Sequence, residues 1–176
     1  MSRVINKASM VATLLVVVLG LTSGFAQDRE RHEIHSMMIY NFLKYIQWPE
    51  SVNSGQFVIG VMGDDDVYST LKAWYGDKER MGKTLLVKKL TSPSDARECQ
   101  LVYIGSAASN SFEAVHGIVS SNPTLIITDK NGLGKRGSGI NFRTVNNRLK
   151  FELNQNALET SKLKVSSQLA AMAIVI

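Results

Sequence analysis

One stretch of the chain imitates a phosphate-binding loop. The segment GDKERMGKT, residues 76–84, combines glycines with a Lys-Thr pair, the residue types that cradle the phosphates of a nucleotide. Five residues separate its two glycines, where the phosphate loop has four, and the apolar run that follows predicts a strand. The phosphate loop needs a helix at that point, because free amides at a helix N-terminus bind the phosphates. We therefore predict no nucleotide site here.

Acidic side chains and histidines are the candidates for a metal site. Asp64, Asp65 and Asp66 could hold a metal ion through their oxygens. Consecutive side chains point in different directions, however, so we favour a cap on the following helix, whose free amides and dipole attract an aspartate. The loop at residues 129–140 has Ile140 where a calcium loop has a bidentate glutamate. No cysteine or second acidic cluster accompanies the histidines, which are His32, His35 and His116. We predict no metal site.

Nucleophilic catalysis has little support in the sequence. The segment GSAAS, residues 105–109, lacks the Gly-x-Ser-x-Gly frame of a serine elbow, and no Cys-His pairing is visible. The single cysteine, Cys99, precedes an apolar run and cannot form an internal disulfide. We expect a small buried apolar residue there, the alternative being a reactive or intermolecular thiol. The prediction is a protein that is not an enzyme and uses no cofactor.

The elements that would position a site follow from apolar runs. Four runs predict buried strands, and segments with helical spacing separate them. The alternation predicts a single Rossmann-like α/β domain of three layers, with a largely parallel sheet between helices. Two further strands joined by Asn146-Asn147 predict a hairpin, which makes the sheet mixed. The four runs lie at residues 56–63, 83–90, 99–105 and 124–129, and the hairpin strands at 140–143 and 148–154.

The carboxyl ends of the predicted parallel strands form the best candidate for a ligand site. Ligands of open α/β sheets bind outside these ends, where glycines allow a close backbone approach and amides attract small anions. Ordinary turn residues are the alternative reading. The candidate ligand- or partner-binding residues are Gly63, Asp64, Gly105, Ser106 and Asn141.

The first helix raises the question of an asparagine among apolar residues. In the segment MIYNFLKYIQWPE, residues 38–50, a turn of about 100° per residue gathers an apolar face that includes Asn41. We predict that Asn41 is a buried structural amide, with a ligand role as the alternative. Pro49 disfavours helix at Trp48, so we expect the helix to run up to that point. Asn154 could likewise be a structural amide or a ligand-binding residue, and we assign it the structural role.

The N-terminus has the features of a secretory signal peptide. Arg3 and Lys7 precede an apolar run of about 12 residues, and small residues follow it. A membrane span needs about 20 apolar residues, so we predict cleavage after Ala26 rather than an anchor. The exported domain would be residues 27–176, without a transmembrane segment. The net charge of +5 then falls to about +3, scattered over the surface, which argues against binding of nucleic acid.

The mature chain resembles the YfiR family of exported bacterial regulators, from about Ile34 to Ile174. The motifs that carry the resemblance are YNFLKYIQWP, VIGVMGDD, CQLVYIGSA, LIITD, GSGINF, RLKFELN and LKVSSQLAAMA. The resemblance implies a periplasmic α/β domain without enzymatic activity, which binds the periplasmic part of a membrane diguanylate cyclase and so lowers cyclic di-GMP and represses biofilm formation. Related domains of the family also occur fused to signalling kinases, where they are sensory inputs. Some members are stabilised by disulfides, which a single Cys99 cannot copy.

Two functions remain in view. The leading hypothesis is a periplasmic regulatory protein whose partner is a membrane-anchored diguanylate cyclase or sensor kinase. The alternative is a periplasmic small-molecule sensor or solute-binding domain, suggested by the glycines at the strand ends. The broadly apolar first helix is compatible with either a partner face or a homodimer face. An exported enzyme of another type would need convergent polar groups that the sequence does not reveal.

Overall fold

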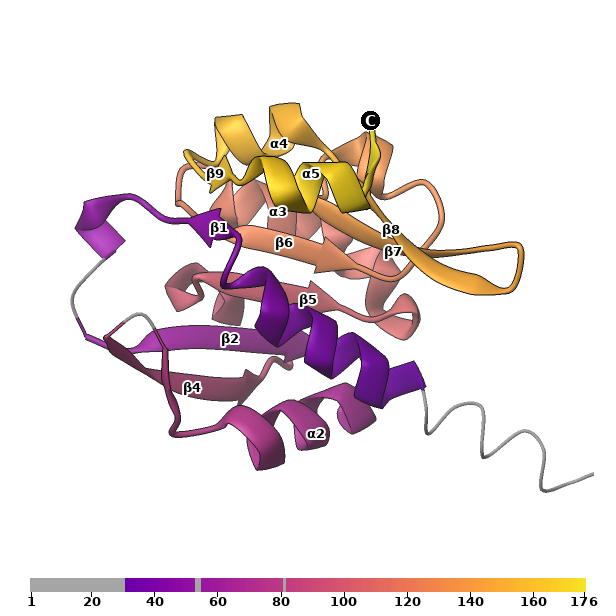
Figure 1. Cartoon of the computed structure of the whole chain (residues 1–176). Coiled ribbons are helices and arrows are strands. Elements are labelled where there is room, and N and C mark those ends of the chain that lie inside the picture. Colours follow the sequence, from indigo (N-terminus) through magenta and orange to yellow (C-terminus); the bar gives the residue numbers. More distant parts are fainter. Residues whose placement is uncertain (1–30, 53–54, 81) are drawn as a thin grey trace, which may run out of the picture.

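The computed structural model describes residues 31–52, 55–80 and 82–176, and the predicted signal peptide lies outside them. Within this part of the chain, an eight-stranded mixed sheet has the order β10-β8-β7-β6-β5-β2-β4-β3 (Figure 1). Five of these strands are parallel neighbours: β2 (Phe57–Met62), β4 (Lys83–Lys89), β5 (Leu101–Ile104), β6 (Leu125–Thr128) and β7 (Ile140–Val145). Numbered along the chain, their order across the sheet is 2-1-3-4-5, which is typical of doubly wound α/β domains. The predicted α/β fold with a mixed sheet is confirmed.

The remaining strands extend the sheet at its two edges. On one side β8 (Arg148–Leu153) pairs antiparallel with β7, and β10 (Ile174–Val175) pairs parallel with β8. On the other side β3 (Glu79–Arg80) pairs antiparallel with β4. The turn of the β7–β8 hairpin has positive φ angles at Asn146 (49°) and Asn147 (57°). Asparagine tolerates this conformation better than most residues, which is why the dipeptide predicts the hairpin correctly.

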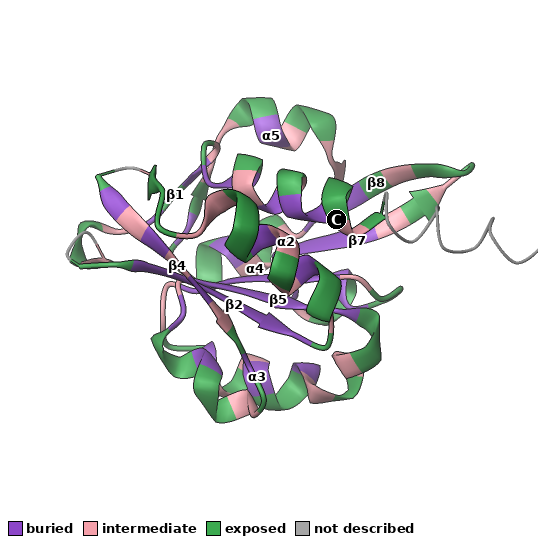
Figure 2. Ribbon diagram, turned by 90° about the horizontal axis from the view of Figure 1, so that it is seen from below, coloured by how far each residue is buried: buried purple, intermediate pink, exposed green. Residues whose placement is uncertain are grey.

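Helices cover both faces of the sheet. The N-terminal helix, described over residues 31–42, lies beside α2 and α5 on one face, and α3 lies on the other (Figures 1 and 2). The predicted aspartate cap is confirmed, since Asp64 accepts from the amide of Val67. Ser166 caps α5 in the same way by accepting from the amide of Leu169. The α-helices are α2 (Asp65–Tyr75), α3 (Phe112–Val119), α4 (Gln155–Thr160) and α5 (Ser167–Met172). The short 3-10 helices are η1 (Glu50–Val52), η2 (Pro93–Glu98), η3 (Ser106–Ser111) and η4 (Gly134–Arg136).

The core is divided in two by the sheet. The larger cluster includes Ile39 and Leu43 of the first segment, Leu71 of α2 and Leu169 of α5. The smaller cluster packs α3 and η2 against the opposite face, with Phe112 at its centre. Strands β2, β5 and β6 are buried along their whole length because both faces are covered (Figure 2). A strand buried on both faces appears in the sequence as a continuous apolar run, and this made these strands predictable.

The prediction for the first helix is wrong in two respects. The α-helix ends at residue 42, well before Pro49, and Ile46–Gln47 form β1, which pairs antiparallel with β9 (Lys164–Val165). Asn41 is exposed, as is Met37, while His35, Ser36, Ile39, Phe42 and Leu43 are buried. The segment has apolar residues on several sides, so its periodicity alone does not select the face that packs on the sheet.

Trp48 and Pro49 follow β1 rather than ending a helix. The Trp48 side chain is buried, and its indole Nε1 donates to the Gln100 carbonyl at 3.2 Å. Its ring meets that of Phe57 edge to face, with centroids 4.9 Å apart. The Pro49 carbonyl accepts from the amide of Val52 in the turn that follows. These contacts fit the structural role that we predicted for both residues.

Candidate functional site

The carboxyl ends of β2 and β5 lie side by side at the point where the sheet changes direction. After β2 the chain crosses to β4 on one side, and it then returns to β5 on the other. Met62 pairs with Ile104, so Gly63-Asp64 and Gly105-Ser106 follow at the same edge, as predicted. In doubly wound sheets this switch point is where ligands bind.

The two glycines at this edge are explained by close packing. Gly63 has a φ of +72°, and a Cβ there would lie 2.3 Å from the Cβ of Ala108 in η3. A Cβ on Gly105 would lie 2.7 Å from the Gly63 carbonyl oxygen. The two turns and η3 therefore pack directly on one another at the carboxyl ends of β2 and β5. This packing alone accounts for both glycines, and a ligand role for them stays a prediction.

A line of hydrogen bonds runs from the N-terminal helix into the strand ends. The His35 Nδ1 lies 3.2 Å from the Tyr103 hydroxyl, which donates to Asp64 Oδ2 at 3.4 Å. The other oxygen of Asp64 accepts from the Val67 amide at 2.9 Å as the cap of α2. The His35 ring also stacks on that of Phe142, with centroids 4.2 Å apart. Each oxygen of Asp64 therefore accepts one hydrogen bond from within the protein.

Charged groups surround a hollow of about 170 Å³ at this edge. The guanidinium of Arg31 donates to both oxygens of Asp129 at 3.0 and 2.9 Å. Burial raises the pKa of Asp129, and Arg31 opposes that shift. Burial, followed by the charges of Arg31 and His32, lowers the pKa of His35 to about 3. The residues lining the hollow are Arg31, His32, His35, Asp64, Asp66, Ser106 and Asp129.

The electrostatics of the His35–Tyr103 pair do not match a general base working near neutral pH. Burial raises the pKa of the Tyr103 hydroxyl, and the charges of Asp129 and Asp64 raise it further. His35 is neutral and Tyr103 is protonated at pH 7, and a base of pKa about 3 is too weak to accept a proton efficiently there. In the described part of the chain, no three His, Cys, Asp or Glu side chains are arranged to hold a metal ion. The arrangement holds the N-terminal helix on the sheet.

Asn141 lies in a buried polar network at the start of β7, where it pairs with Thr128 at the carboxyl end of β6. Its Oδ1 accepts from the Thr128 hydroxyl at 2.7 Å and from the Lys130 amide at 3.3 Å. Its Nδ2 donates to Glu152 at 2.8 Å, and Glu152 also accepts from Arg143 at 2.7 Å. Both ends of the amide are thus occupied by protein groups. The contacts fit the structural reading of Asn141 better than the ligand role.

The other residues predicted to be structural have separate surroundings. The Asn154 Oδ1 caps α4 by accepting from Ala157, while its Nδ2 donates to the Gly134 carbonyl at 2.8 Å. Cys99 is 2% exposed, and burial raises the pKa of its thiol to about 11. Its surroundings are those of the inert, buried cysteine that we favoured over a reactive thiol.

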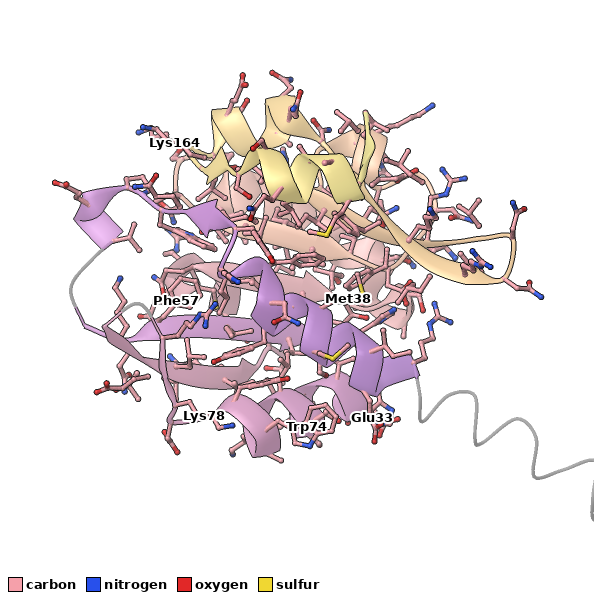
Figure 3. The ribbon with its side chains drawn as sticks, in the orientation of Figure 1. Glu33, Met38, Phe57, Trp74, Lys78 and Lys164 are labelled. Atoms are coloured by element: carbon pink, nitrogen blue, oxygen red, sulfur yellow. The ribbon has the colours of Figure 1, made fainter. Side chains whose placement is uncertain are left out.

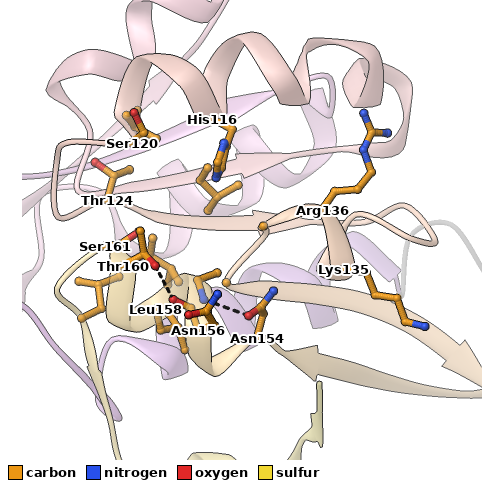
Figure 4. Close-up of a pocket in the computed structure, with 17 residues that line it drawn as sticks. His116, Ser120, Thr124, Lys135, Arg136, Asn154, Asn156, Leu158, Thr160 and Ser161 are labelled. Atoms are coloured by element: carbon orange, nitrogen blue, oxygen red, sulfur yellow. Dashed lines mark hydrogen bonds between the residues drawn. The ribbon is translucent and has the colours of Figure 1, made fainter.

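A second hollow, of about 300 Å³, lies between α3 and α4 (Figure 4). His116 of α3 and Asn156 of α4 line opposite walls, with Lys135 and Arg136 at the η4 end. Arg136 is already paired with Glu113. The sequence did not indicate this hollow, because its walls come from separate segments between residues 116 and 163 that no repeated spacing connects.

The sheet order, the two helical layers and the glycine turns at the switch point define a doubly wound α/β domain. The chain belongs to the YfiR/HmsC-like family, whose model matches residues 32–174. This finding confirms the resemblance to the YfiR family seen in the sequence. No curated protein sequence matches significantly.

Two solved structures share the fold at low sequence identity. One is a conserved domain protein from Vibrio cholerae O1 biovar eltor, with 12% identity and a TM-score of 0.55; the match covers 82% of this chain and 59% of that one. The other is the ABC domain in complex with L-Trp from Streptococcus pneumoniae, with 12% identity and a TM-score of 0.50; the match covers 68% of this chain and 55% of that one. This chain therefore spans little more than half of either protein. At such identity the likeness concerns the fold alone.

Proposed function

We propose that the chain is an exported, non-enzymatic regulator that binds the periplasmic part of a membrane-anchored signalling protein. The partner we favour is a diguanylate cyclase, which the bound regulator would restrain and so lower cyclic di-GMP. Family membership over residues 32–174 carries this proposal. None of the helices in the described residues is long and apolar enough to cross a membrane.

One helical layer offers a surface for such a partner. Ile34 and Met37 of the N-terminal helix are 38% and 46% exposed, Trp74 of α2 is 40% exposed, and Met172 of α5 is 55% exposed. These four residues define what we call the front helical face, after the layer that faces the reader in Figures 1 and 3. Three helices of one layer thus carry exposed large apolar side chains, and exposed apolar surface is where protein–protein contacts form. This surface supports a binding function.

The proposal is tested by chemical crosslinking in cells that export a tagged form of the chain. The expected product is a crosslink to a membrane signalling protein, identified by mass spectrometry. Met37→Asp should reduce its yield, because it adds a charge to the front helical face. Thr144→Asp, which adds the same charge to the exposed part of the β7–β8 hairpin, is the matched control. Recovery of only a second copy of this chain would instead assign the face to a homodimer and contradict the proposal.

A further inference from the structure

A cationic groove of about 660 Å³ lies on the side of the molecule opposite the strand carboxyl ends. It runs between the segment around β1 and the amino end of β4, and residues of β2, β3 and β9 complete it. Figure 3 shows Phe57 and Lys164, which lie on this side of the molecule. The groove has one acidic lining residue, Glu50, and the cationic ones are Lys44, Arg80, Lys83 and Lys164. This excess of positive charge favours an anionic ligand.

Lys83 is the unusual member of this set. It is only 6% exposed and lines the groove, yet it forms no ion pair or hydrogen bond with any residue that the structure describes. Further along the same strand, Lys88 pairs with Glu98 and Lys89 pairs with Asp65. Lysines are almost never so largely buried unless they are paired. The stem of the Lys83 side chain is covered, while its ammonium group stays accessible from the groove without a partner among the described residues.

Burial alone lowers the pKa of Lys83. An anion bound next to the ammonium would offset this desolvation, because an opposite charge favours the charged form. The ammonium of Lys83 is therefore available to pair with an anion that enters the groove.

The groove also has an apolar wall. Trp48 and Phe57 form it from two neighbouring segments, with their rings in edge-to-face contact at 4.9 Å. The polar atom of Trp48, Nε1, is already bonded to the Gln100 carbonyl. Trp48 is 7% and Phe57 1% exposed, so the accessible part of this wall is small, belongs mainly to Trp48, and is apolar. It suits the edge of a small hydrocarbon or aromatic group.

We propose that this groove binds a small organic anion, with its carboxylate or phosphate at Lys83 and its apolar body against Trp48 and Phe57. Lys44 and Lys164 add to the positive field, while Arg80 lies over the Tyr40 ring with 5.2 Å between guanidinium and centroid. The groove is separate from the front helical face, and the inference stands without the regulatory function proposed above.

The test is calorimetric titration of the full chain, expressed with its own N-terminal segment, with four probes. Phenyl phosphate and benzoate carry both parts of the ligand, inorganic phosphate carries the charge alone, and benzyl alcohol carries the apolar body alone. Phenyl phosphate or benzoate should bind best, depending on whether the site prefers a phosphate or a carboxylate. Inorganic phosphate should bind at least roughly tenfold more weakly, and benzyl alcohol should show no measurable binding.

Variants at Lys83 assign the binding to the groove. Lys83→Met should weaken the best probe by roughly tenfold or more, because a charged hydrogen bond is lost. Lys150→Met, at an exposed lysine of β8, should leave binding unchanged. Lys83→Arg keeps the charge and should retain binding. If Lys83→Met fails to fold, Lys83→Gln, which also removes the charge, replaces it and should weaken binding to the same extent. No binding of either organic anion at about 10 mM, or equal binding by Lys83→Met, would overturn the proposal.

Discussion

The network around Asn141 gives a prediction whose size follows from the contacts. Replacing Asn141 with alanine removes one acceptor of the Thr128 hydroxyl, at 2.7 Å, and the side-chain acceptor of the Lys130 amide, at 3.3 Å. Ser138 Oγ, at 2.9 Å, remains as an acceptor for Thr128. It also removes the donor to Glu152 at 2.8 Å, and leaves Arg143 as the remaining side-chain donor to that carboxyl group. Asn141 is fully buried, so water does not readily replace these partners.

The cost of the substitution is the sum of these lost contacts. A buried polar group without its partner costs about 1–3 kcal/mol, and a bond to a charged group is at the upper end of that range. The Lys130 contact is long and contributes least. Since Thr128 can still donate to Ser138, the lost bond to Glu152 dominates. We expect Asn141→Ala to lower the free energy of unfolding by about 2–3 kcal/mol, and the melting temperature of a domain of this size by about 5–10 °C.

Urea unfolding monitored by circular dichroism measures this cost. Asn41→Ala is the matched control, because Asn41 is exposed and its replacement should change the free energy of unfolding by no more than about 0.5 kcal/mol. A cost below about 1 kcal/mol for Asn141→Ala, or a cost equal to that of the control, would refute the account of the network. A large cost for Asn41→Ala would show that the first helix packs as the sequence pattern indicated.

Three further predictions concern the strand ends and the cysteine. Gly63→Ala should lower the free energy of unfolding in urea by several kcal/mol, because the new Cβ would lie 2.3 Å from that of Ala108. Gly132→Ala is the control, since Gly132 also has a positive φ but a Cβ there would meet nothing within 4 Å; its cost should be only about 1–2 kcal/mol. Burial lowers the pKa of His35 in the folded chain to about 3, whereas the unfolded chain binds this proton already below about pH 6.5. The free energy of unfolding should therefore fall by about 1.4 kcal/mol for each unit that the pH is lowered between these two values. Unfolding measured at several pH values should show that His35→Gln removes this part of the slope; an unchanged slope would contradict the assignment. Because burial raises the pKa of Cys99 to about 11, its thiol should react with a disulfide reagent at pH 8 only after unfolding in urea, and rapid reaction of the folded chain would show that it is accessible.

Most of the fold could be predicted because its signals are local. The buried strands are continuous apolar runs, Asn146-Asn147 indicates the hairpin, and Asp64 caps the helix it precedes. The first helix could not be predicted fully, because its packing face depends on which side meets the sheet. Strand β1 also depends on a partner distant in the sequence, since Ile46 pairs with Val165.

The site was predicted less well, because its contacts join distant residues. His35 and Tyr103 are 68 positions apart, and Arg31 and Asp129 are 98 apart, so no local spacing connects them. Asp64 and the glycines were located correctly at the sheet edge, but their side-chain and packing contacts are internal. Lys83 appeared in the sequence as an ordinary first residue of a strand, and only the fold buries it.

The most direct test of the proposed regulatory function is the level of cyclic di-GMP in the host bacterium with and without the gene for this chain. The account predicts that deletion raises cyclic di-GMP, and that the exported protein restores the original level. A form that lacks residues 1–26 should not restore it, because the partner domain lies in the periplasm. An unchanged level after deletion, or full restoration by the form without residues 1–26, would contradict the account.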